Sequence, residues 1–382
     1  MNSLKLVLEW RKDWTGERDP KAIRTRLAVL RGCKPTDMEL LSNRVREARD
    51  GRALLAKELA WPIYDELHMI GSVFATSNPL DLLELADIAG SDRLIVQQRF
   101  EALCLTDLAI AMYQLERIDS MNRVEEDMRG MIDLLQRRIF SGTTRDLDIY
   151  TYHDAQDMFR VKGVSYDVSG EFPNLVQRKH NSLCRVTKEG IVLRFDVRPK
   201  DRFRTVVKLV KQLNAPKEGQ DPYLVKDRCG FKFVVQSTED AIALAEELEW
   251  FLVASGADVK SDGDNLTVET GVGADVTNPH TSPNYRKKQL AVHWHGRWYE
   301  FQIVLFSGYY SAQYALDDEN HTVYKLRQGM KDILPMLYPG KIFLEEKTWE
   351  SDALQKMLLE RQLENLGWWH QRKQRNGVIK HS

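Results

Sequence analysis

The feature of this sequence that most constrains its fold is a change in the spacing of the apolar residues. Between Leu94 and Ile139 apolar residues return every three or four positions, as they do in an amphipathic helix. After about residue 190, several short runs alternate apolar and polar residues, as a half-buried strand does. The change predicts an α/β protein in which a mixed sheet flanked by helices follows an all-helical N-terminal domain.

The helical pattern extends from about residue 20 to residue 140. Asn78–Pro79 has the residue types of a helix N-cap and first turn. The run from Leu94 to Ile139 predicts one or two long helices, and we interpret its Met and Leu stripe as core rather than as a cofactor site. Ser141–Thr143 follows, and we interpret this short polar stretch, with its central glycine, as a linker.

Strand and helix patterns alternate in the second half of the chain. The strand patterns cover residues 191–197, 230–236, 265–270, 289–295 and 297–306. The last two predict a hairpin across Gly296. A helix is expected over 203–213 and another after Ser237, which with Asp240 resembles a capping box. The chain turns helical again from Asp317.

We therefore expect three parts. They are a helical accessory or regulatory domain over 1–145, a catalytic domain over 146–345, and a C-terminal helix with a basic tail over 346–382. The helical domain is a candidate for binding a protein partner or a second copy of the chain. The tail could contact a polyanion, and a solvated terminus is the alternative interpretation.

Charge and cysteine content exclude several classes of protein. Fifty-five Lys and Arg residues balance 56 Asp and Glu residues, so any anion site must be local. The four cysteines form no C-x-x-C pair, which argues against a zinc module or a redox pair. Reduced cysteines, together with the lack of a signal-like start and of a long apolar stretch, predict a cytoplasmic protein without membrane contact.

The densest cationic stretch is RPKDRFRTVVKLVK, residues 198–211. Its first basic residues fall at a predicted turn from strand to helix, where backbone N–H groups already favour an anion. The stretch is therefore a candidate for binding phosphates, and a triphosphate is the natural ligand. A solvated basic helix face is the alternative. The basic residues are Arg198, Lys200, Arg202, Arg204, Lys208 and Lys211, against the single acid Asp201.

Two carboxylates are candidates for holding Mg²⁺. Asp227 comes directly before a predicted strand. Glu300 and Gln302 share one face of another strand, whose apolar neighbours point to the opposite side. Mg²⁺ prefers hard oxygen ligands and keeps its waters and the phosphates of a substrate. A structural role for an outward Glu on a half-buried strand is the alternative.

Five short segments lie in the order found in a known family. They are Arg198–Lys200 with Lys208, DRCGFK from Asp227 to Lys232, DVTNPHTSPNY from Asp275 to Tyr285, E-x-Q at Glu300 and Gln302, and HTVYK from His321 to Lys325. Together they resemble the synthetase domain of the RelA/SpoT family, alarmone-making pyrophosphotransferases with a nucleotidyltransferase-like fold. The resemblance covers roughly residues 150 to 345.

This resemblance implies an activity and a set of site residues. It implies transfer of pyrophosphate from ATP to the 3′-hydroxyl of GDP or GTP, giving (p)ppGpp, with Asp227 and Glu300 as catalytic residues and Mg²⁺ ligands. Glu300 would help the metal or activate the hydroxyl, and Tyr285 would stack on the acceptor base. The implied nucleotide-binding residues are Arg198, Lys200, Arg204, Lys208, Lys232, Tyr285, Gln302 and His321.

The chain also departs from the family pattern. Arg204 replaces the serine of the phosphate loop, and Thr281 replaces a lysine that contacts the acceptor phosphates. The acceptor is therefore open, and adenine nucleotides or the 3′ end of tRNA are alternatives. A catalytically inactive sensor of the same fold that binds a nucleotide or RNA is another.

Two histidine-containing pairs complete the candidates: His293 with His295, and His153 with Asp154. His293 and His295 could share one strand face and bind a transition metal, although no third ligand is evident and a place at the rim of the site is the alternative. His153 and Asp154 are similar to the dyad of metal phosphohydrolases, but the other His and Asp positions of such a domain are missing from residues 1–150. We therefore expect no alarmone hydrolase domain.

Overall fold

The computed structural model describes residues 17–60, 63, 67, 69–154, 161–167, 172, 175–214, 225–266, 285–314, 321–344, 349 and 351–364. The chain divides into two compact units. The first, here called the helical unit, comprises Met1–Met121, Asp201–Val225 and Leu326–Arg361. The second, the sheet unit, comprises Asn122–Lys200, Lys226–Lys325 and Gln362–Ser382. The expected parts follow one another along the sequence, whereas these units alternate along it.

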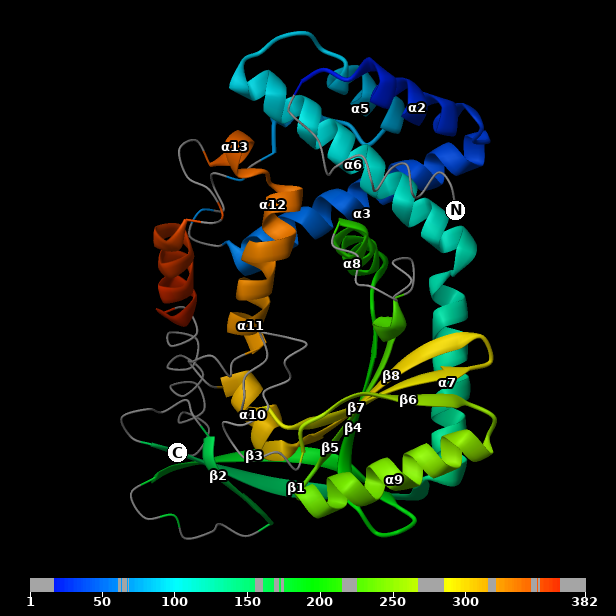
Figure 1. Ribbon diagram of the computed structural model, residues 1–382, viewed down its shortest axis with the longest axis vertical. Helices are drawn as coiled ribbons and strands as arrows, with labels where there is room; N and C mark the ends of the chain where they lie inside the picture. Colours follow the sequence, from blue (N-terminus) through cyan, green and yellow to red (C-terminus); the bar gives the residue numbers. More distant parts are fainter. Residues whose placement is uncertain are drawn as a thin grey trace, which may run out of the picture. The chain divides into compact units, whose positions relative to one another are not determined.

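The helical unit is built from helices of all three of its segments (Figure 1). They are α2 (Pro20–Arg31), α3 (Pro35–Leu59), α4 (Gly71–Ala75), α5 (Pro79–Ala86), α6 (Arg93–Ile118), α8 (Arg202–Asn214), η4 (Gly329–Ile333), α12 (Leu334–Leu337), α13 (Gly340–Phe343) and a last helix over 352–364. The predicted cap of α5 is confirmed, because the Asn78 side chain accepts a hydrogen bond from the backbone N–H of Leu80 at 3.0 Å.

One apolar core runs through the helical unit and includes residues from each of its segments. Leu82 and Leu108 come from the first segment, Val206 from α8 and Leu334 from α12. The arginines buried in this unit include Arg26 and Arg52. Arg26 makes a bidentate ion pair with Asp107, at 2.9 and 3.0 Å, and Arg52 donates to the backbone carbonyl of Leu337 at 2.9 Å.

The sheet unit contains one eight-stranded sheet in the order β2-β1-β3-β4-β5-β8-β7-β6. Its strands are β1 (Phe140–Asp154), β2 (Val161–Tyr166), β3 (Leu175–Thr187), β4 (Val192–Pro199), β5 (Cys229–Val235), β6 (Asp258–Asp264), β7 (Lys287–Trp294) and β8 (Arg297–Leu305). Only the β5–β8 pair is parallel among these strands. The sheet is therefore mixed, as the sequence predicts.

The two faces of the sheet are covered differently. Apolar residues of α7 (Met121–Arg138) and α9 (Thr238–Ala254) pack with Phe231, Phe233 and Phe301 on one face. On the opposite face, α10 (Phe306–Tyr314) contributes Phe306 and Tyr310 to a smaller cluster at the β1 side. Figure 1 shows α9 and α10 on different sides of the strands. The smaller cluster covers only part of the α10 face. Over much of β4, β5, β8 and β7 the side chains on this face are therefore polar.

Most predicted elements are confirmed. The predicted strands at 191–197, 230–236, 289–295 and 297–306 correspond to β4, β5, β7 and β8, and the predicted helices to α8 and α9. The N-cap at Ser237 is confirmed, since its hydroxyl accepts from the Asp240 N–H at 3.0 Å. The hairpin across Gly296 is confirmed by the antiparallel pairing of β7 with β8.

Two local predictions are wrong. Residues 141–143 are no linker, because β1 begins at Phe140 and Gly142 lies within it with a φ of 85°. The strand expected at 265–270 does not include Asn265 or Leu266, and the rest of it lies outside the described residues. The strand in this part of the chain is β6, which ends at Asp264. Its sequence, DVKSDGD, has little apolar alternation because β6 lies at the edge of the sheet.

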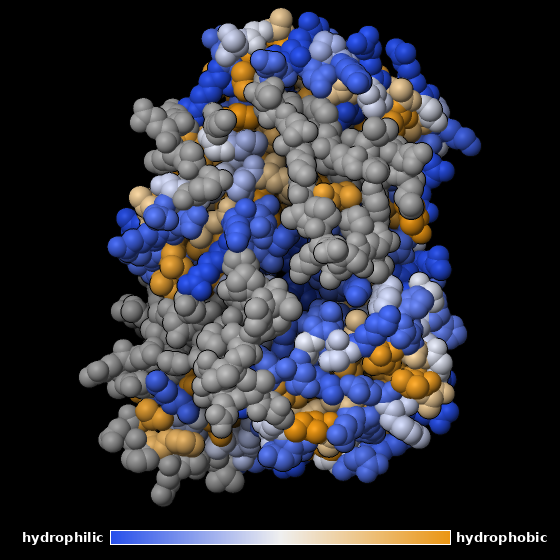
Figure 2. Space-filling view, in the orientation of Figure 1, coloured by the Kyte–Doolittle hydropathy of each residue, from blue (hydrophilic) through white to orange (hydrophobic). Residues whose placement is uncertain are grey.

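Among the described residues, no helix combines the length and apolar content that crossing a bilayer requires. In the view of Figure 2 the described surface is mostly hydrophilic, and its apolar residues are scattered in small groups.

Candidate functional site

The side chains on the α10 face of the central strands are mostly polar, and we call this surface the polar face. The prediction for β8 is confirmed: Tyr299, Phe301 and Ile303 lie in the apolar cluster on the other side, so Glu300 and Gln302 point to the polar face. Residues of β4, β5 and β7 that are in register with these side chains lie on the same face and widen the polar face. Its residues are Arg194, Asp196, Arg198, Gly230, Lys232, Trp298, Glu300, Gln302, Gln289, Ala291 and His293.

One row of the polar face crosses four strands. Asp196 is in register with Lys232, Lys232 with Gln302, and Gln302 with Gln289. Partial burial lowers the pKa of Lys232, and the nearby carboxylates of Asp196 and Glu300 oppose that shift. The implied nucleotide-binding residues Lys232 and Gln302 therefore lie side by side on adjacent strands.

Two further side chains hold Asp196 in place at the end of this row. The Arg194 guanidinium donates to both carboxylate oxygens of Asp196, at 2.9 and 3.1 Å. The Tyr309 hydroxyl of α10 donates to the same carboxylate at 3.3 Å. The Lys232 ammonium lies 5.9 Å from the centre of the Tyr309 ring. Asp196 thus has two partners that fix its position beside Lys232.

The next row carries Glu300 between two small residues. Gly230 and Ala291 are its register partners on β5 and β7, and Arg198 is opposite Gly230 on β4. The Gln289 amide donates to Glu300 Oε1 at 2.7 Å, which orients the carboxylate. A Cβ placed on Gly230 would meet, among the described atoms, only the carbonyl oxygen of Arg198 within 4 Å, at 3.3 Å. Side chains next to Glu300 are therefore short.

Asp227 and Lys200 lie together where β4 ends and β5 begins. Asp227 is in the short helix η3 (Lys226–Arg228), and its carboxylate forms an ion pair with the Lys200 ammonium. The Lys200 N–H donates to the Arg228 carbonyl at 2.9 Å, which ties the two chain segments. Both side chains are half-buried, with 23% and 21% of their surface exposed.

The two candidate metal ligands lie toward the same end of adjacent parallel strands. Glu300 is level with Gly230, and Asp227 comes three residues before Gly230. Among the described residues, no group of three His, Cys, Asp or Glu side chains gathers as a metal site. Mg²⁺ needs only one or two carboxylates when water and phosphate complete its shell, and the oxygens of Asp227 and Glu300 are of the hard type that this ion prefers.

The basic stretch at 198–211 divides between the two units after Lys200. In the helical unit, Asp201 caps α8: its carboxylate accepts from the Arg204 N–H at 2.7 Å. The Arg204 guanidinium lies 3.3 Å from the Glu58 carboxylate. The first turn of α8 is thus already occupied by an acid of the protein itself. Lys208 lies on the same helix, half-buried.

The side chain of Tyr285 is partly buried. It lies against the smaller apolar cluster, and its ring would be 3.7 Å from a Cβ at Gly308 of α10. Burial raises the pKa of its hydroxyl, and the Glu300 carboxylate raises it further. The Asn265 side chain donates to its carbonyl at 3.0 Å. The residue is partly buried against this cluster, and stacking of its ring on an acceptor base stays a prediction.

One other candidate lies on a helix, and two more positions lie outside the described residues. His321 begins α11 (His321–Gln328) and stacks on Tyr324, with ring centres 6.0 Å apart. Asp275 and Thr281 lie outside the described residues.

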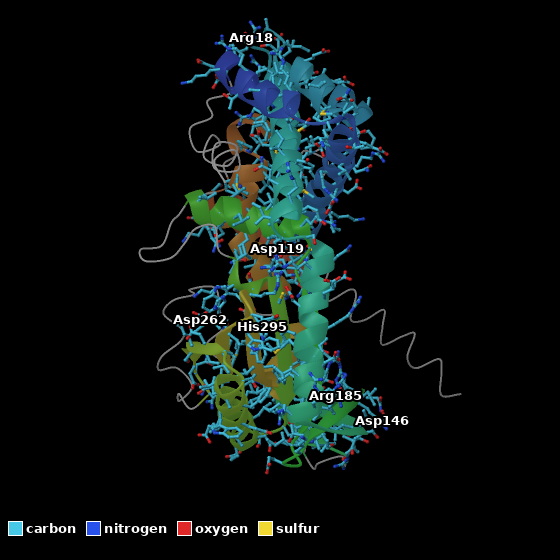
Figure 3. All side chains as sticks on the ribbon, turned by 90° about the vertical axis from the view of Figure 1, so that its right-hand side faces the viewer. Arg18, Asp119, Asp146, Arg185, Asp262 and His295 are labelled. Atoms are coloured by element: carbon cyan, nitrogen blue, oxygen red, sulfur yellow. The ribbon has the colours of Figure 1, made fainter. Side chains whose placement is uncertain are left out.

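The two histidine-containing pairs lie at different strands of the sheet unit, β1 and β7. His293 lies on β7, whereas His295 (labelled in Figure 3) belongs to the turn, with a φ of 50°, so the two do not continue one strand face as expected. His153 is fully buried in β1 and hydrogen-bonded to the Thr151 hydroxyl at 2.8 Å.

Sequence reasoning gave no site role to Arg194, Asp196, Gln289 and Trp298 of the polar face, or to Tyr309 of α10, which contacts Asp196. Asp196 and Trp298 could have been found by extending the alternation of β4 and β8, because they lie two residues from Arg198 and Glu300 respectively. Gln289 and Tyr309 could not, since strand pairing and the position of α10 bring them to the site.

Comparisons with protein-family models, with curated proteins and with solved structures found no match to this chain.

Proposed function

We propose that this protein transfers pyrophosphate from ATP to the 3′-hydroxyl of a nucleotide, as the synthetase domain of the RelA/SpoT family does. The proposal rests chiefly on one observation: the DRCGFK and E-x-Q segments, which are separate in sequence, form adjacent parallel strands in register. Gly230 pairs with Glu300 and Lys232 with Gln302. A carboxylate, a lysine and an amide therefore share one face of the sheet.

The proposed reaction needs charge neutralisation and alignment rather than covalent catalysis. The acceptor 3′-oxygen forms a bond to the β-phosphorus of ATP, the bond from that phosphorus to the α–β bridging oxygen breaks, and AMP leaves. Glu300, oriented by Gln289, accepts the hydroxyl proton. Arg198, Lys200 and Lys232 bind the phosphates and stabilise their negative charge.

Asp227, with Glu300 as a second ligand, would hold Mg²⁺, which neutralises charge on the triphosphate when bound. Asp227 already has a cationic neighbour in Lys200. In this proposal the flexible side chain of Lys200 turns from Asp227 toward the donor phosphates.

The test is a transfer assay with γ-labelled ATP and Mg²⁺. GDP, GTP, ATP and bulk tRNA are offered separately as acceptors, and labelled products are separated by chromatography. We expect a labelled nucleotide carrying the transferred pyrophosphate, and the acceptor that yields it identifies the substrate. If none of the four acceptors becomes labelled, the proposal is wrong. That result would favour the alternative of a catalytically inactive sensor that binds a nucleotide or RNA.

Two variants locate the chemistry within the sheet unit. Glu300→Gln removes the proton acceptor and should lower the transfer rate by at least about 100-fold. Asp146→Asn is the matched control, because Asp146 (labelled in Figure 3) is an exposed acid of β1 whose register places it on the other face of the sheet. It should retain full activity. Equal activity of the Glu300→Gln variant and the native protein would exclude this role.

A further inference from the structure

The polar face carries an aromatic side chain that the resemblance to the RelA/SpoT family does not single out. Trp298 is on β8, two residues before Glu300, and is only half-buried. Because side chains alternate along a strand, its side chain lies on the same face as that of Glu300, and the Cα atoms of the two residues are about 7 Å apart along the strand. By contrast, the ring of Tyr285 is packed against α10 and the apolar cluster.

Nitrogen-bearing side chains from three other elements surround the Trp298 ring. The Lys226 ammonium of η3 lies 5.1 Å from its centre, and the Lys260 ammonium of β6 lies 5.8 Å away. The His293 ring of β7 is 4.9 Å away, inclined by 32°. Of the two lysines, Lys260 also pairs with Asp258 at 3.2 Å.

These neighbours suit a ligand with both an aromatic and an anionic part. An indole face attracts ammonium groups and nucleobases alike, because both interact favourably with its π-electrons. Lysine has a flexible stem, so its ammonium can move from the ring to a phosphate oxygen when a base takes its place. Aromatic surface with nearby cations is the arrangement by which proteins bind single-stranded nucleic acids without sequence preference, because any base can stack on it.

The position of the ring sets which part of the ligand it contacts. Lys226 precedes Asp227 directly in sequence, and Asp227 forms the ion pair with Lys200. Between Trp298 and the Lys232–Gln302 row lies the row with Gly230 and Ala291, whose side chains are small. A nucleotide whose base lies on Trp298 can therefore direct its phosphates toward Lys226 and Lys200.

We infer that Trp298 is the base-stacking residue of a nucleotide site on the polar face, with Lys226 and Lys260 as its phosphate-binding partners. This inference rests on the proposed function for the identity of the reaction, but the binding site itself can be tested without any transfer. The ligand class is a nucleoside di- or triphosphate.

The experiment measures equilibrium binding to the full chain by isothermal titration calorimetry. The probes are ATP, GTP and GDP, with inorganic tripolyphosphate as a probe that has phosphates but no base. For Trp298→Ala we expect the Kd of at least one nucleotide to rise roughly 5- to 150-fold, which is the range reported for loss of one stacked base. The Kd of tripolyphosphate should stay within about twofold of the native value.

Matched variants separate stacking from a structural role. Trp298→Phe keeps an aromatic face and should restore most of the nucleotide affinity. Trp250→Ala should change nothing, because Trp250 is 75% exposed on α9, which packs on the other face of the sheet. Lys226→Ala should raise the Kd of the nucleotides and the Kd of tripolyphosphate by the same factor. Circular dichroism and thermal unfolding verify that each variant is folded.

Three results would overturn the inference: unchanged nucleotide binding in Trp298→Ala, an equal loss of tripolyphosphate binding in that variant, or no binding of any of the three nucleotides to the native protein. Failure of the proposed function gives a different result. In that case the native protein binds nucleotides in a Trp298-dependent way but transfers no pyrophosphate to any acceptor.

Discussion

At the scale of single residues, His180 gives the sheet unit a defined sensitivity to acid. Its ring stacks on Tyr310, with centres 4.4 Å apart, and its Nε2 atom is 2.9 Å from the Thr151 hydroxyl. Burial lowers its pKa from 6.5 to about 4, and the charge of Arg178 adds to the shift. In the unfolded chain the same imidazole takes up a proton near pH 6.5.

The unfolded state therefore binds a proton more readily than the folded state between these two values. Stability falls as the pH falls from about 6.5 to about 4, by about 2 kcal/mol after allowance for the partial exposure of the ring. We predict that His180→Phe, which keeps the stacking on Tyr310, loses this part of the acid sensitivity. Urea unfolding at pH 7 and pH 4.5 measures it.

The control for this prediction is His295→Asn, which replaces an exposed turn histidine with a residue that also tolerates a positive φ. Its loss of stability between the two pH values should equal that of the native protein. If the His180→Phe variant loses as much stability in acid as the native protein does, then His180 does not cause the effect.

Lys232 illustrates a conflict between stability and binding. Burial lowers its pKa, so the folded protein holds the charged ammonium less readily than the unfolded chain. We predict that Lys232→Met, which keeps the length of the side chain without its charge, raises the free energy of unfolding at pH 7. The gain should shrink as the pH rises from the lowered pKa toward its ordinary value of about 10.4, because the native lysine then also becomes neutral.

The same substitution should weaken nucleotide binding, since it removes a cation from the polar face. Urea unfolding at pH 7 and pH 9.5, together with calorimetric titration of ATP, provides both measurements. A Lys232→Met protein that is less stable than the native protein at pH 7 would show that the attraction of Asp196 and Glu300 outweighs the burial of the ammonium.

At the scale of elements, the β7–β8 turn fixes the register that brings Gln289 beside Glu300. His295 and Gly296 both have a positive φ, 50° and 76°, as a two-residue hairpin turn of type I′ requires. Gly296→Ala should therefore destabilise the protein by about 1 to 2 kcal/mol. Urea unfolding at neutral pH measures the change.

Gly130 is the matched control for this substitution. It lies inside α7, and a Cβ placed there meets no described atom within 4 Å. Gly130→Ala should therefore stabilise the protein by about 0.5 to 1 kcal/mol. Opposite signs for the two Gly→Ala substitutions are the expected result. A destabilising Gly130→Ala, or a neutral Gly296→Ala, would contradict the argument from backbone conformation.

The elements also show how far sequence reasoning can reach. Strands β5 and β8 were predictable, because their buried residues alternate with polar ones, and that alternation also identified the face of Glu300 and Gln302. The strands from β1 to β3 were harder to predict from the sequence. The long strands among them carry charged residues such as Arg145 and Lys179 on exposed positions, so they lack a clear apolar period.

The site was predictable only where it follows from local pattern. The E-x-Q strand and the acid before β5 each have a signature within a few residues. Pairing between strands does not, so the contact of Gln289 with Glu300 and of Tyr309 with Asp196 required the fold. The prediction of free backbone N–H groups at the start of α8 was wrong, because Asp201, interpreted as a lone acid in a basic stretch, is the cap of this helix.

At the scale of the whole molecule, each compact unit is assembled from separate segments of the chain. Arg52 of α3 shows the consequence within the helical unit. Its guanidinium is fully buried, donates to the Leu337 carbonyl, and lies 4.4 Å from the centre of the Tyr338 ring. The Tyr338 hydroxyl in turn donates to the Arg52 carbonyl at 2.9 Å. Residues 285 positions apart thus depend on each other for their hydrogen bonds.

We therefore predict that a chain ending at Lys325 loses the cooperative unfolding of its helical unit. The truncation removes Leu326, Leu334 and Leu337, which are fully buried in the core of that unit. At about 1.5 to 3 kcal/mol for each buried side chain, their loss is comparable with the roughly 5 to 15 kcal/mol that stabilises a typical domain. It also leaves the Arg52 charge without its carbonyl partner.

A chain ending at Glu364 is the control, because it retains every residue that the structure places in this core. Thermal unfolding followed by far-UV circular dichroism, with binding of an apolar dye as a measure of exposed core, distinguishes the two truncations. The shorter chain should bind the dye at 25 °C and lose helical signal gradually, while the control unfolds like the native protein. A sharp, native-like transition in the chain that ends at Lys325 would mean that residues 1–121 and 201–225 fold without the C-terminal helices, and that the alternation of segments is not needed for stability.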